Sequence, residues 1–159
     1  MNDVNAIPEG MTAVTPYLIL DDANGAIEFC KEAFGAEERY RMVAPGTDII
    51  MHAEIVIGGA VIMLGQHNAD WGSLSPKELG GSPAFVHLYV DDADAVQAKA
   101  VAAGATEEMA VTEMFWGDRM GKIVDPHGYC WSIGTHVADP TPEEMEAGLK
   151  AMMSGEGRD

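Results

Sequence analysis

Basic residues and cysteines are both scarce in this 159-residue sequence. Nine lysines and arginines stand against 26 aspartates and glutamates, which gives a net charge of −17. Phosphate backbones and anionic lipid surfaces are bound by clusters of basic residues, so we expect neither nucleic acid nor a membrane as a partner. Cys30 and Cys130 form no CxxC pattern. This favours two buried free thiols over a disulfide or a redox pair.

Long apolar runs and a leader segment are also missing. No stretch approaches the roughly 20 apolar residues that a transmembrane helix needs, and residues 1–10 have neither the basic nor the apolar region of a signal peptide. Hydrophobic residues nevertheless make up 47% of the chain, enough for a sizeable core at this length. These features predict a small globular protein of the cytoplasm.

One motif occurs twice. Residues 17–24, Tyr-Leu-Ile-Leu-Asp-Asp-Ala-Asn, recur at 87–94 as His-Leu-Tyr-Val-Asp-Asp-Ala-Asp. Each copy leads through a helix-like stretch to a glycine, Gly35 or Gly104. A repeated strand–helix unit predicts two related modules, and the cleft between them is the natural place to enclose a ligand.

Hydrophobic periodicity and turn residues predict a β-α-β-β-β order in each module. The expected strands are 12–20, 36–43, 49–57 and 60–64 in the first module and 84–90, 105–114, 118–124 and 129–136 in the second, with helices between Asp22 and Gly35 and at 93–103. The pair Gly58-Gly59 predicts a two-residue hairpin. Capping boxes at 75–78 and 141–144 predict one helical turn and a C-terminal helix.

The predicted fold class is therefore α+β, with two tandem βαβββ modules that form a pseudo-symmetric pair of half-barrels around a central cavity. We expect one compact domain overall. Its expected divisions are an N-terminal extension at 1–11, a first module at 12–65, a connecting loop at 66–83, a second module at 84–137, and a C-terminal helix and tail at 138–159.

In their order along the chain, these motifs resemble the vicinal oxygen chelate superfamily, which includes glyoxalase I, bleomycin resistance proteins and extradiol dioxygenases. The narrower resemblance is to the PhnB-like branch. It covers about residues 12–137 and rests on the segments 16–22, 33–37, 52–58, 115–119 and 125–132. The resemblance implies a homodimer and a small-molecule ligand or substrate. It also implies, for metal-using members, four His or Glu ligands on the first, fourth, fifth and eighth strands.

The repeat locates these four ligand positions in the sequence. Aligning the Asp-Asp pairs that follow the first and fifth strands gives Thr15 and Phe85, and aligning the glycines of the two later turns gives Met63 and Ser132. Phenylalanine has no donor atom, and methionine is soft where divalent cations prefer imidazole or carboxylate. We therefore expect the usual metal site to be lost. No cofactor is predicted, and a divalent metal elsewhere stays open.

Strand alternation supplies other candidates for chemistry. A two-residue glycine hairpin places Glu54 and His52 on the cavity face of the third strand, and His87 faces the cavity from the fifth. These three are candidate catalytic acid–base residues and a weak alternative metal site. The alternative is structural. His52 and Glu54 would pair with each other or with Arg41, and His87 would hydrogen-bond to Tyr17, its symmetry mate.

The segment Trp116-Gly-Asp-Arg119 offers an indole for stacking and a guanidinium fork for a carboxylate or phosphonate. In the alternative, Arg119 pairs with Asp118 or Asp125. Trp71 in the connecting loop is either a lid residue or packs on its own loop. The other residues expected to bind a ligand are Tyr17, Met63, Phe85, Tyr89, Phe115 and Ser132.

Two functions are open at this point. The loss of four usual ligands favours a small-molecule-binding protein, in the manner of bleomycin resistance proteins. The cluster of His52, Glu54 and His87 favours an enzyme of the lyase, isomerase or dioxygenase type, with a non-standard metal or with acid–base chemistry alone. We expect the binding protein, as a homodimer.

Overall fold

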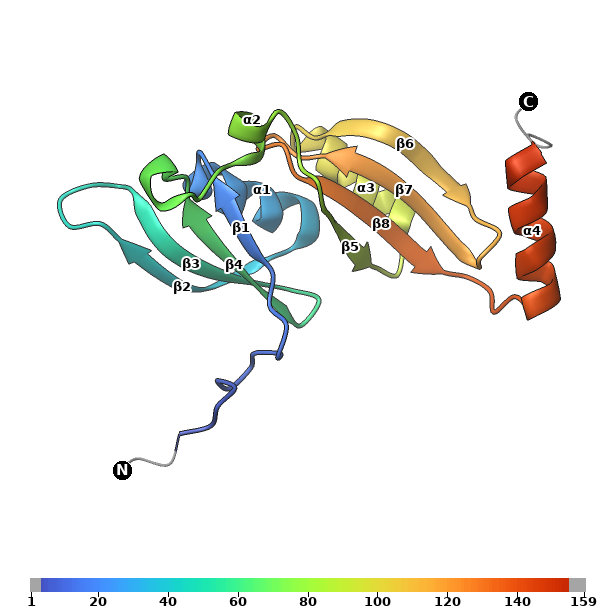
Figure 1. Ribbon diagram of the computed structural model, residues 1–159, viewed down its shortest axis with the longest axis horizontal. Coiled ribbons are helices and arrows are strands. Elements are labelled where there is room, and N and C mark those ends of the chain that lie inside the picture. Colours follow the sequence, from blue (N-terminus) through green and yellow to red (C-terminus); the bar gives the residue numbers. More distant parts are fainter. Residues whose placement is uncertain (1–3, 155–159) are drawn as a thin grey trace.

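The computed structural model describes residues 4–154 as two four-stranded sheets that lie side by side, each with a helix packed against one face (Figure 1). The first module consists of β1 (Tyr17–Leu20), α1 (Ala23–Phe34), β2 (Glu37–Val43), β3 (Ile50–Ile57) and β4 (Ala60–Gln66). The second repeats the order with β5 (Phe85–Tyr89), α3 (Ala93–Ala102), β6 (Thr106–Glu113), β7 (Asp118–Val124) and β8 (Cys130–His136). The predicted α+β class and the βαβββ repeat are confirmed.

Two short elements and one longer helix complete the described part of the chain. The 3-10 turn η1 (Ala69–Trp71) and the helix α2 (Pro76–Leu79) connect the modules, and α4 (Pro142–Ser154) follows the second sheet. Figure 1 shows α4 beyond the β6–β7 end of that sheet, far from the N-terminal segment. None of the helices within residues 4–154 has the length and apolar character needed to cross a membrane.

Both sheets have the same strand order, β1-β4-β3-β2 and β5-β8-β7-β6. The first and last strands of each module run parallel, and the other neighbours run antiparallel. Tyr17 pairs with Met63 in the first module, and His87 pairs with Ser132 in the second. The internal repeat of the sequence is therefore also a repeat of strand register.

The first strand begins five residues later than predicted, at Tyr17 instead of Thr12. Thr12 donates its side-chain hydroxyl to the carbonyl of Val14, and Thr15 donates to the carbonyl of Thr12 at 3.1 Å. These local bonds hold a bend, because such hydroxyls compete with the sheet for backbone groups. Pairing with β4 starts only at the carbonyl of Pro16, which accepts from Met63 N at 2.9 Å.

Local sequence signals explain where the other elements begin and end. Gly58 and Gly59 have φ values of 55° and 82°, which a two-residue hairpin of this kind requires, and the predicted pairing of Glu54 with Met63 is confirmed. Asp22 caps α1 by accepting from Gly25 N at 2.9 Å. α2 and α4 begin where predicted. Thr141 and Glu144 form a reciprocal capping box, whereas at 75–78 only Ser75 Oγ accepts from Glu78 N and the Ser75 N–H donates to His67.

The core lies between each sheet and its helix, and the helix layer joins the two modules. α1 packs against α3, and the ring of Phe34 on α1 lies 4.6 Å from that of Trp131 on β8. The hydroxyl of Tyr129 donates to the carbonyl of Ile19 at 3.0 Å and accepts from its N–H at 2.8 Å. The largest fully buried side chains are Trp131, Leu20, Ile27, Ile50, Ile55, Leu64, Ile123 and Ile133.

The two cysteines are free thiols, as predicted. Cys30 lies on the buried face of α1, as expected, whereas Cys130 at the start of β8 is partly exposed and not buried. Burial, with a smaller contribution from Asp125, raises the pKa of Cys30 to about 12. The Cys30 thiol therefore stays protonated at neutral pH and packs as a small apolar group.

Candidate functional site

Each sheet has a hollow on the face that its helix leaves open. The first hollow has a volume of about 600 Å³ and the second about 490 Å³. The first is lined by Tyr17, Ile19, Ala44, Ile49, Met51, Gly65, Gln66, His67, Asn68, Trp71 and Ser73. The second is lined by Phe85, His87, Met109, Met114, Trp116, Asp118, Met120, Lys122, Ser132 and Met152. Each hollow thus belongs to one module, and a cavity shared by both modules stays a prediction.

Two β-bulges shape the first sheet. Between the pairs Val43–Ile50 and Met42–His52, β3 carries one extra residue, Met51. An extra residue of this kind redirects side chains locally, and Met51 lines the first hollow from β3, the strand that also carries His52. A second register shift, on β2, leaves Arg39 as the extra residue. The strand alternation used above takes no account of bulges and so misses both side chains.

A chain of polar contacts crosses this face of the first sheet. The Tyr17 hydroxyl lies 3.1 Å from His52 Nδ1, and His52 Nε2 lies 3.5 Å from Glu54 Oε1. Glu54 Oε2 lies 3.6 Å from Arg39 Nε, and Arg39 also donates to the carbonyl of Glu9 at 2.7 Å. Burial raises the pKa of Tyr17, which keeps its hydroxyl protonated. The arrangement can pass a proton between the phenol and the imidazole.

The predicted pairing of His52 with Glu54 is therefore present, but its cationic neighbour is Arg39. Arg41 lies on the helix side of β2, where it donates to Glu38 and to Asn24 of α1. Tyr17 bonds to His52 within its own module and not to His87. In the strand order β1-β4-β3-β2, only β4 separates Tyr17 on β1 from His52 on β3, whereas His87 belongs to the other sheet.

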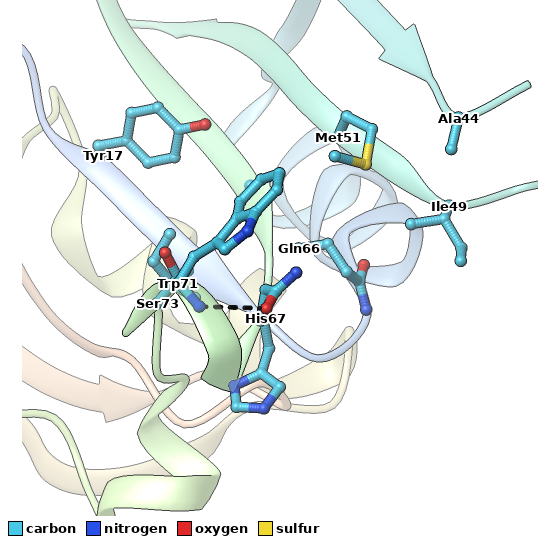
Figure 2. Close-up of a pocket in the computed structure, with 11 residues that line it drawn as sticks. Tyr17, Ala44, Ile49, Met51, Gln66, His67, Trp71 and Ser73 are labelled. Atoms are coloured by element: carbon cyan, nitrogen blue, oxygen red, sulfur yellow. Dashed lines mark hydrogen bonds between the residues drawn. The ribbon is translucent and has the colours of Figure 1, made fainter.

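Trp71 stands on a tight loop between β4 and α2. The Asn68 side chain holds this loop, because its Oδ1 accepts from the backbone N–H of Asp70 at 3.0 Å and of Trp71 at 3.3 Å. The indole is 73% exposed, yet it lines the first hollow. Figure 2 shows it extending toward Tyr17 and Met51. Trp71 thus forms a wall of the hollow and is not packed away on its own loop.

In the second sheet, the candidate residue His87 bonds to Ser132. Its Nδ1 lies 2.7 Å from Ser132 Oγ, which is buried at the base of the second hollow. The ring of His87 also packs edge-on against Tyr89, with 4.4 Å between centroids. His52 and Glu54 therefore lie on one sheet and His87 on the other.

A compact polar cluster closes one end of the second hollow. Asp118 accepts from Tyr89 at 3.0 Å and from His136 Nδ1 at 3.0 Å, and His136 Nε2 lies 3.0 Å from Asp139. Burial alone would raise the pKa of Asp118, but the hydrogen bonds from His136 and Tyr89 lower it overall. The bond to Asp118, with help from Asp139, raises the pKa of His136. Opposite charges thus stabilise each other here.

Arg119 does not reach either hollow. It lies on the helix side of β7 and forms a two-pronged ion pair with Asp94 of α3, at 2.7 and 2.8 Å. Both alternatives given above are therefore wrong for this side chain: it is no anion fork beside Trp116, and it pairs with neither Asp118 nor Asp125. Alternation along β7 points neighbours to opposite faces, so Asp118 and Arg119 separate.

The residues at the four ligand positions that the family resemblance implies are not suited to bind a divalent metal here. Thr15 precedes β1 and bonds to its own loop, Met63 and Ser132 pair with Tyr17 and His87, and Phe85 has no donor atom. Within residues 4–154, no three His, Cys, Asp or Glu side chains are grouped as a metal ion would require. Within one chain, His52, Glu54 and His87 therefore do not form the alternative three-ligand site.

The remaining predicted ligand-binding residues divide between the two modules. Tyr17 lines the first hollow, and Phe85, Trp116 and Ser132 line the second. Met63 pairs with Tyr17 and Glu54 in the first sheet, and Tyr89 belongs to the Asp118 cluster. Phe115 lies under α4, where Gly148 packs against its ring.

Comparison with known proteins extends these observations. The profile of the Glyoxalase/Bleomycin resistance protein/Dioxygenase superfamily matches residues 11–133. An uncharacterized protein of Mycobacterium bovis is 38% identical over 146 residues, which cover 90% of this chain and 95% of the relative. The solved structure of the Arabidopsis thaliana gene product At5g48480 has a TM-score of 0.60 at 26% identity, covering 77% of this chain and 98% of that chain. A PhnB protein of Bacillus cereus shares the fold, with a TM-score of 0.60 at 17% identity and coverage of 78% and 99%.

Proposed function

Because the chain belongs to the glyoxalase/bleomycin resistance protein/dioxygenase superfamily, we propose that it is a binding protein for a small planar organic molecule. The guest lies in the first hollow and stacks on Trp71. The observation that carries this proposal is an indole that is 73% exposed while it forms one wall of a 600 Å³ hollow. An aromatic ring held over a concavity offers a stacking surface to a ligand at little cost in conformational entropy.

The walls of the first hollow indicate the character of the guest. Met51 is adaptable and partly exposed, and Tyr17 adds a second aromatic face. None of the described lining residues is a lysine or an arginine, and the protein carries a net charge of −17. A neutral or cationic guest suits this surface better than an anion. Because the family metal positions do not fit a metal, binding proceeds through stacking and hydrogen bonds.

A titration with 2-naphthol, a neutral planar probe, tests this proposal. We expect saturable binding by calorimetry and a loss of about tenfold or more in affinity for Trp71→Ala, with most of the affinity kept in Trp71→Phe. Trp116→Ala is the matched control, since it removes an indole from the second hollow. Equal affinities of the Trp71→Ala and wild-type proteins would contradict the proposal, as would no binding to the wild type.

An acid–base enzyme is the second candidate, favoured by the contacts between Tyr17, His52 and Glu54. In this function Tyr17 gives its phenolic proton to a bound substrate, and His52, oriented by Glu54, takes a proton from solvent and passes it to the phenolate, which restores the phenol. Each compound that binds the first hollow is to be incubated with wild type, Glu54→Gln and Tyr17→Phe and then analysed by mass spectrometry. Conversion by the wild type alone would support the enzyme. An unchanged compound in all three would support the binding protein.

We also infer a homodimer of the PhnB-like branch that acts in the cytoplasm. The branch rests on the sequence motifs at 16–22, 52–58 and 125–132. Exposed aromatic side chains on the open sheet faces support pairing of two copies, because exposed apolar patches commonly mark protein–protein interfaces. They include Tyr17, Tyr40, Phe85 and Tyr89, each between 47% and 61% exposed. Size-exclusion chromatography with light scattering checks this, and a monomer at micromolar concentration would contradict it.

A further inference from the structure

The second hollow has a cation at its base. Lys122 lies on β7 directly opposite Ser132 of β8, and Ser132 lies opposite His87 of β5. Side chains paired across neighbouring strands point to the same face of a sheet. The ammonium of Lys122, the hydroxyl of Ser132 and the imidazole of His87 therefore form one row across the open face, and all three line the hollow.

Lys122 has no carboxylate partner within the part of the chain that the structure describes. None of the ion pairs among these residues includes Lys122. Its ammonium instead forms a cation–π contact with the ring of Phe85, whose centroid lies 5.4 Å from Nζ. Five other cationic side chains form ion pairs, namely Lys31, Arg39, Arg41, Arg119 and Lys150. A half-buried lysine with no carboxylate partner among residues 4–154 stands out in a chain with 26 acidic residues.

The one carboxylate in the lining of the second hollow is already engaged. Asp118 accepts hydrogen bonds from Tyr89 and His136, and it is 5% exposed. Both of its carboxylate oxygens are therefore engaged by Tyr89 and His136 and are turned away from solvent. The positive charge at Lys122 remains for a ligand.

Apart from this polar row and Asp118, the lining of the hollow is apolar. Its walls are the side chains of Phe85, Met109, Met114, Trp116, Met120 and Met152, the last contributed by α4. Methionine side chains adapt to guests of different shape. A volume of about 490 Å³ is within the range of small-molecule sites.

We propose that the second hollow is a separate binding site for an apolar carboxylate, an aromatic or medium-chain monocarboxylic acid whose carboxylate is anchored by Lys122. The ammonium holds the charge. In the tautomer where His87 donates to Ser132 Oγ, the Ser132 hydroxyl donates to a carboxylate oxygen. The apolar body of the ligand lies among the methionines and Trp116. This site is independent of ligand binding in the first hollow, whose described lining contains no lysine or arginine.

The test uses 2-naphthoate and its neutral isostere 2-naphthamide, titrated calorimetrically into the full-length protein. A Trp71→Ala background weakens stacking in the first hollow, so the remaining heat reports on the second. In this background Lys122→Met removes the charge while keeping an unbranched side chain, and Lys122→Arg keeps the charge. Lys99→Met is the matched control, because Lys99 is an exposed lysine of α3 and lines neither hollow.

We expect 2-naphthoate to bind the background protein at least about tenfold more tightly than 2-naphthamide does. Lys122→Met abolishes this preference, Lys122→Arg keeps most of it, and Lys99→Met leaves it unchanged. The proposal is overturned if the acid does not bind, if the amide binds as well as the acid, or if Lys122→Met binds the acid normally. Circular dichroism of each variant confirms that the fold is retained.

Discussion

The phenol ring of Tyr17 lies against the backbone of Gly65, so closely that a Cβ at position 65 would stand 2.8 Å from Tyr17 Cε1. The second module repeats this relationship, with His87 Cε1 at 3.2 Å from a Cβ built at Gly134. Neither glycine has a positive φ. Space and not backbone conformation therefore favours glycine at both places, strongly at Gly65 and only moderately at Gly134, and each glycine leaves room for the ring on the neighbouring parallel strand.

Replacing Gly65 by alanine tests this relationship. The added methyl pushes the Tyr17 ring away from His52, so we expect Gly65→Ala to lower the free energy of unfolding by about 1–3 kcal/mol and to weaken 2-naphthol binding. Urea unfolding and calorimetry measure the two effects. Gly134→Ala is the matched variant, with a smaller cost because the clash is looser. Equal losses of free energy of unfolding in the two variants would show that the tight contact with Tyr17 does not cause the destabilisation.

Removing only the hydroxyl of Tyr17 isolates its bond to His52. Tyr17→Phe keeps the ring over Gly65 and should lower the free energy of unfolding by about 0.5–1.5 kcal/mol. Tyr40→Phe is the control, since the Tyr40 ring lies 6.1 Å from that of His52 but its hydroxyl has no hydrogen bond recorded among residues 4–154. Urea unfolding measures the loss of free energy of unfolding in each variant. Equal losses in Tyr17→Phe and Tyr40→Phe would show that the Tyr17–His52 bond contributes nothing.

The contact between His136 and Asp118 makes stability depend on pH. The pKa of His136 is raised above its usual 6.5, so its contribution is fully present below 6.5 and is lost as pH rises through the raised value. The pKa of Asp118 is lowered from 3.8, so its contribution is present above 3.8 and is lost as pH falls through the lowered value. The pair therefore stabilises the fold most between about pH 4 and 6.5.

Thermal unfolding of wild type and His136→Gln from pH 4 to pH 9 measures this contribution. The difference in melting temperature should be largest below pH 6.5 and should shrink toward pH 9. Asp139→Asn gives the same trend with a smaller amplitude, because Asp139 is exposed and is the second partner of the same imidazole. A difference that grows with pH would contradict the assignment.

The docking of α4 depends on Gly148. A Cβ at this position would stand 2.6 Å from Cγ of Phe115. Replacing glycine by alanine within a helix ordinarily stabilises the helix by about 0.5–1 kcal/mol, which by itself would slow hydrogen exchange. We therefore expect faster exchange of residues 142–154 in Gly148→Ala, because the clash with Phe115 outweighs this gain. The double variant Phe115→Ala/Gly148→Ala should recover slow exchange, because the smaller side chain makes room. If Gly148→Ala exchanges as slowly as wild type, α4 does not depend on this contact.

Much of the fold follows from local patterns in the sequence. The repeat at 17–24 and 87–94 predicts the two modules, and the pair Gly58-Gly59 predicts the register that sets Glu54 beside Met63. Where prediction fails, side chains compete with the sheet: hydroxyls of Thr12 and Thr15 hold a bend that delays β1. Composition alone predicts a strand there, because threonine and valine favour strands.

The site is less predictable, because its residues come together through irregular backbone and long-range packing. Strand alternation predicts that His52 and Glu54 share one face of β3, and both join the polar contacts there, although neither lines one of the two hollows. A bulge that adds one residue has no signal in the sequence, so Arg39 is missed. For Arg119 the prediction fails in the other direction, because a residue expected at the site lies outside it. Its place after Trp116 suggests a shared site, whereas alternation along β7 turns it toward Asp94. Lys122 becomes conspicuous only in the structure, where no carboxylate within residues 4–154 pairs with it.

The contacts of Tyr129 with Ile19 and of Trp131 with Phe34 tie the two halves of the duplication into one cooperative folding unit. A half-chain expressed alone would leave Trp131, which is 1% exposed, open to solvent on its helix side. Heating should therefore melt both modules together, in one calorimetric transition whose van't Hoff and calorimetric enthalpies agree. The duplicated modules have become interdependent, and neither half is expected to keep its hollow without the other.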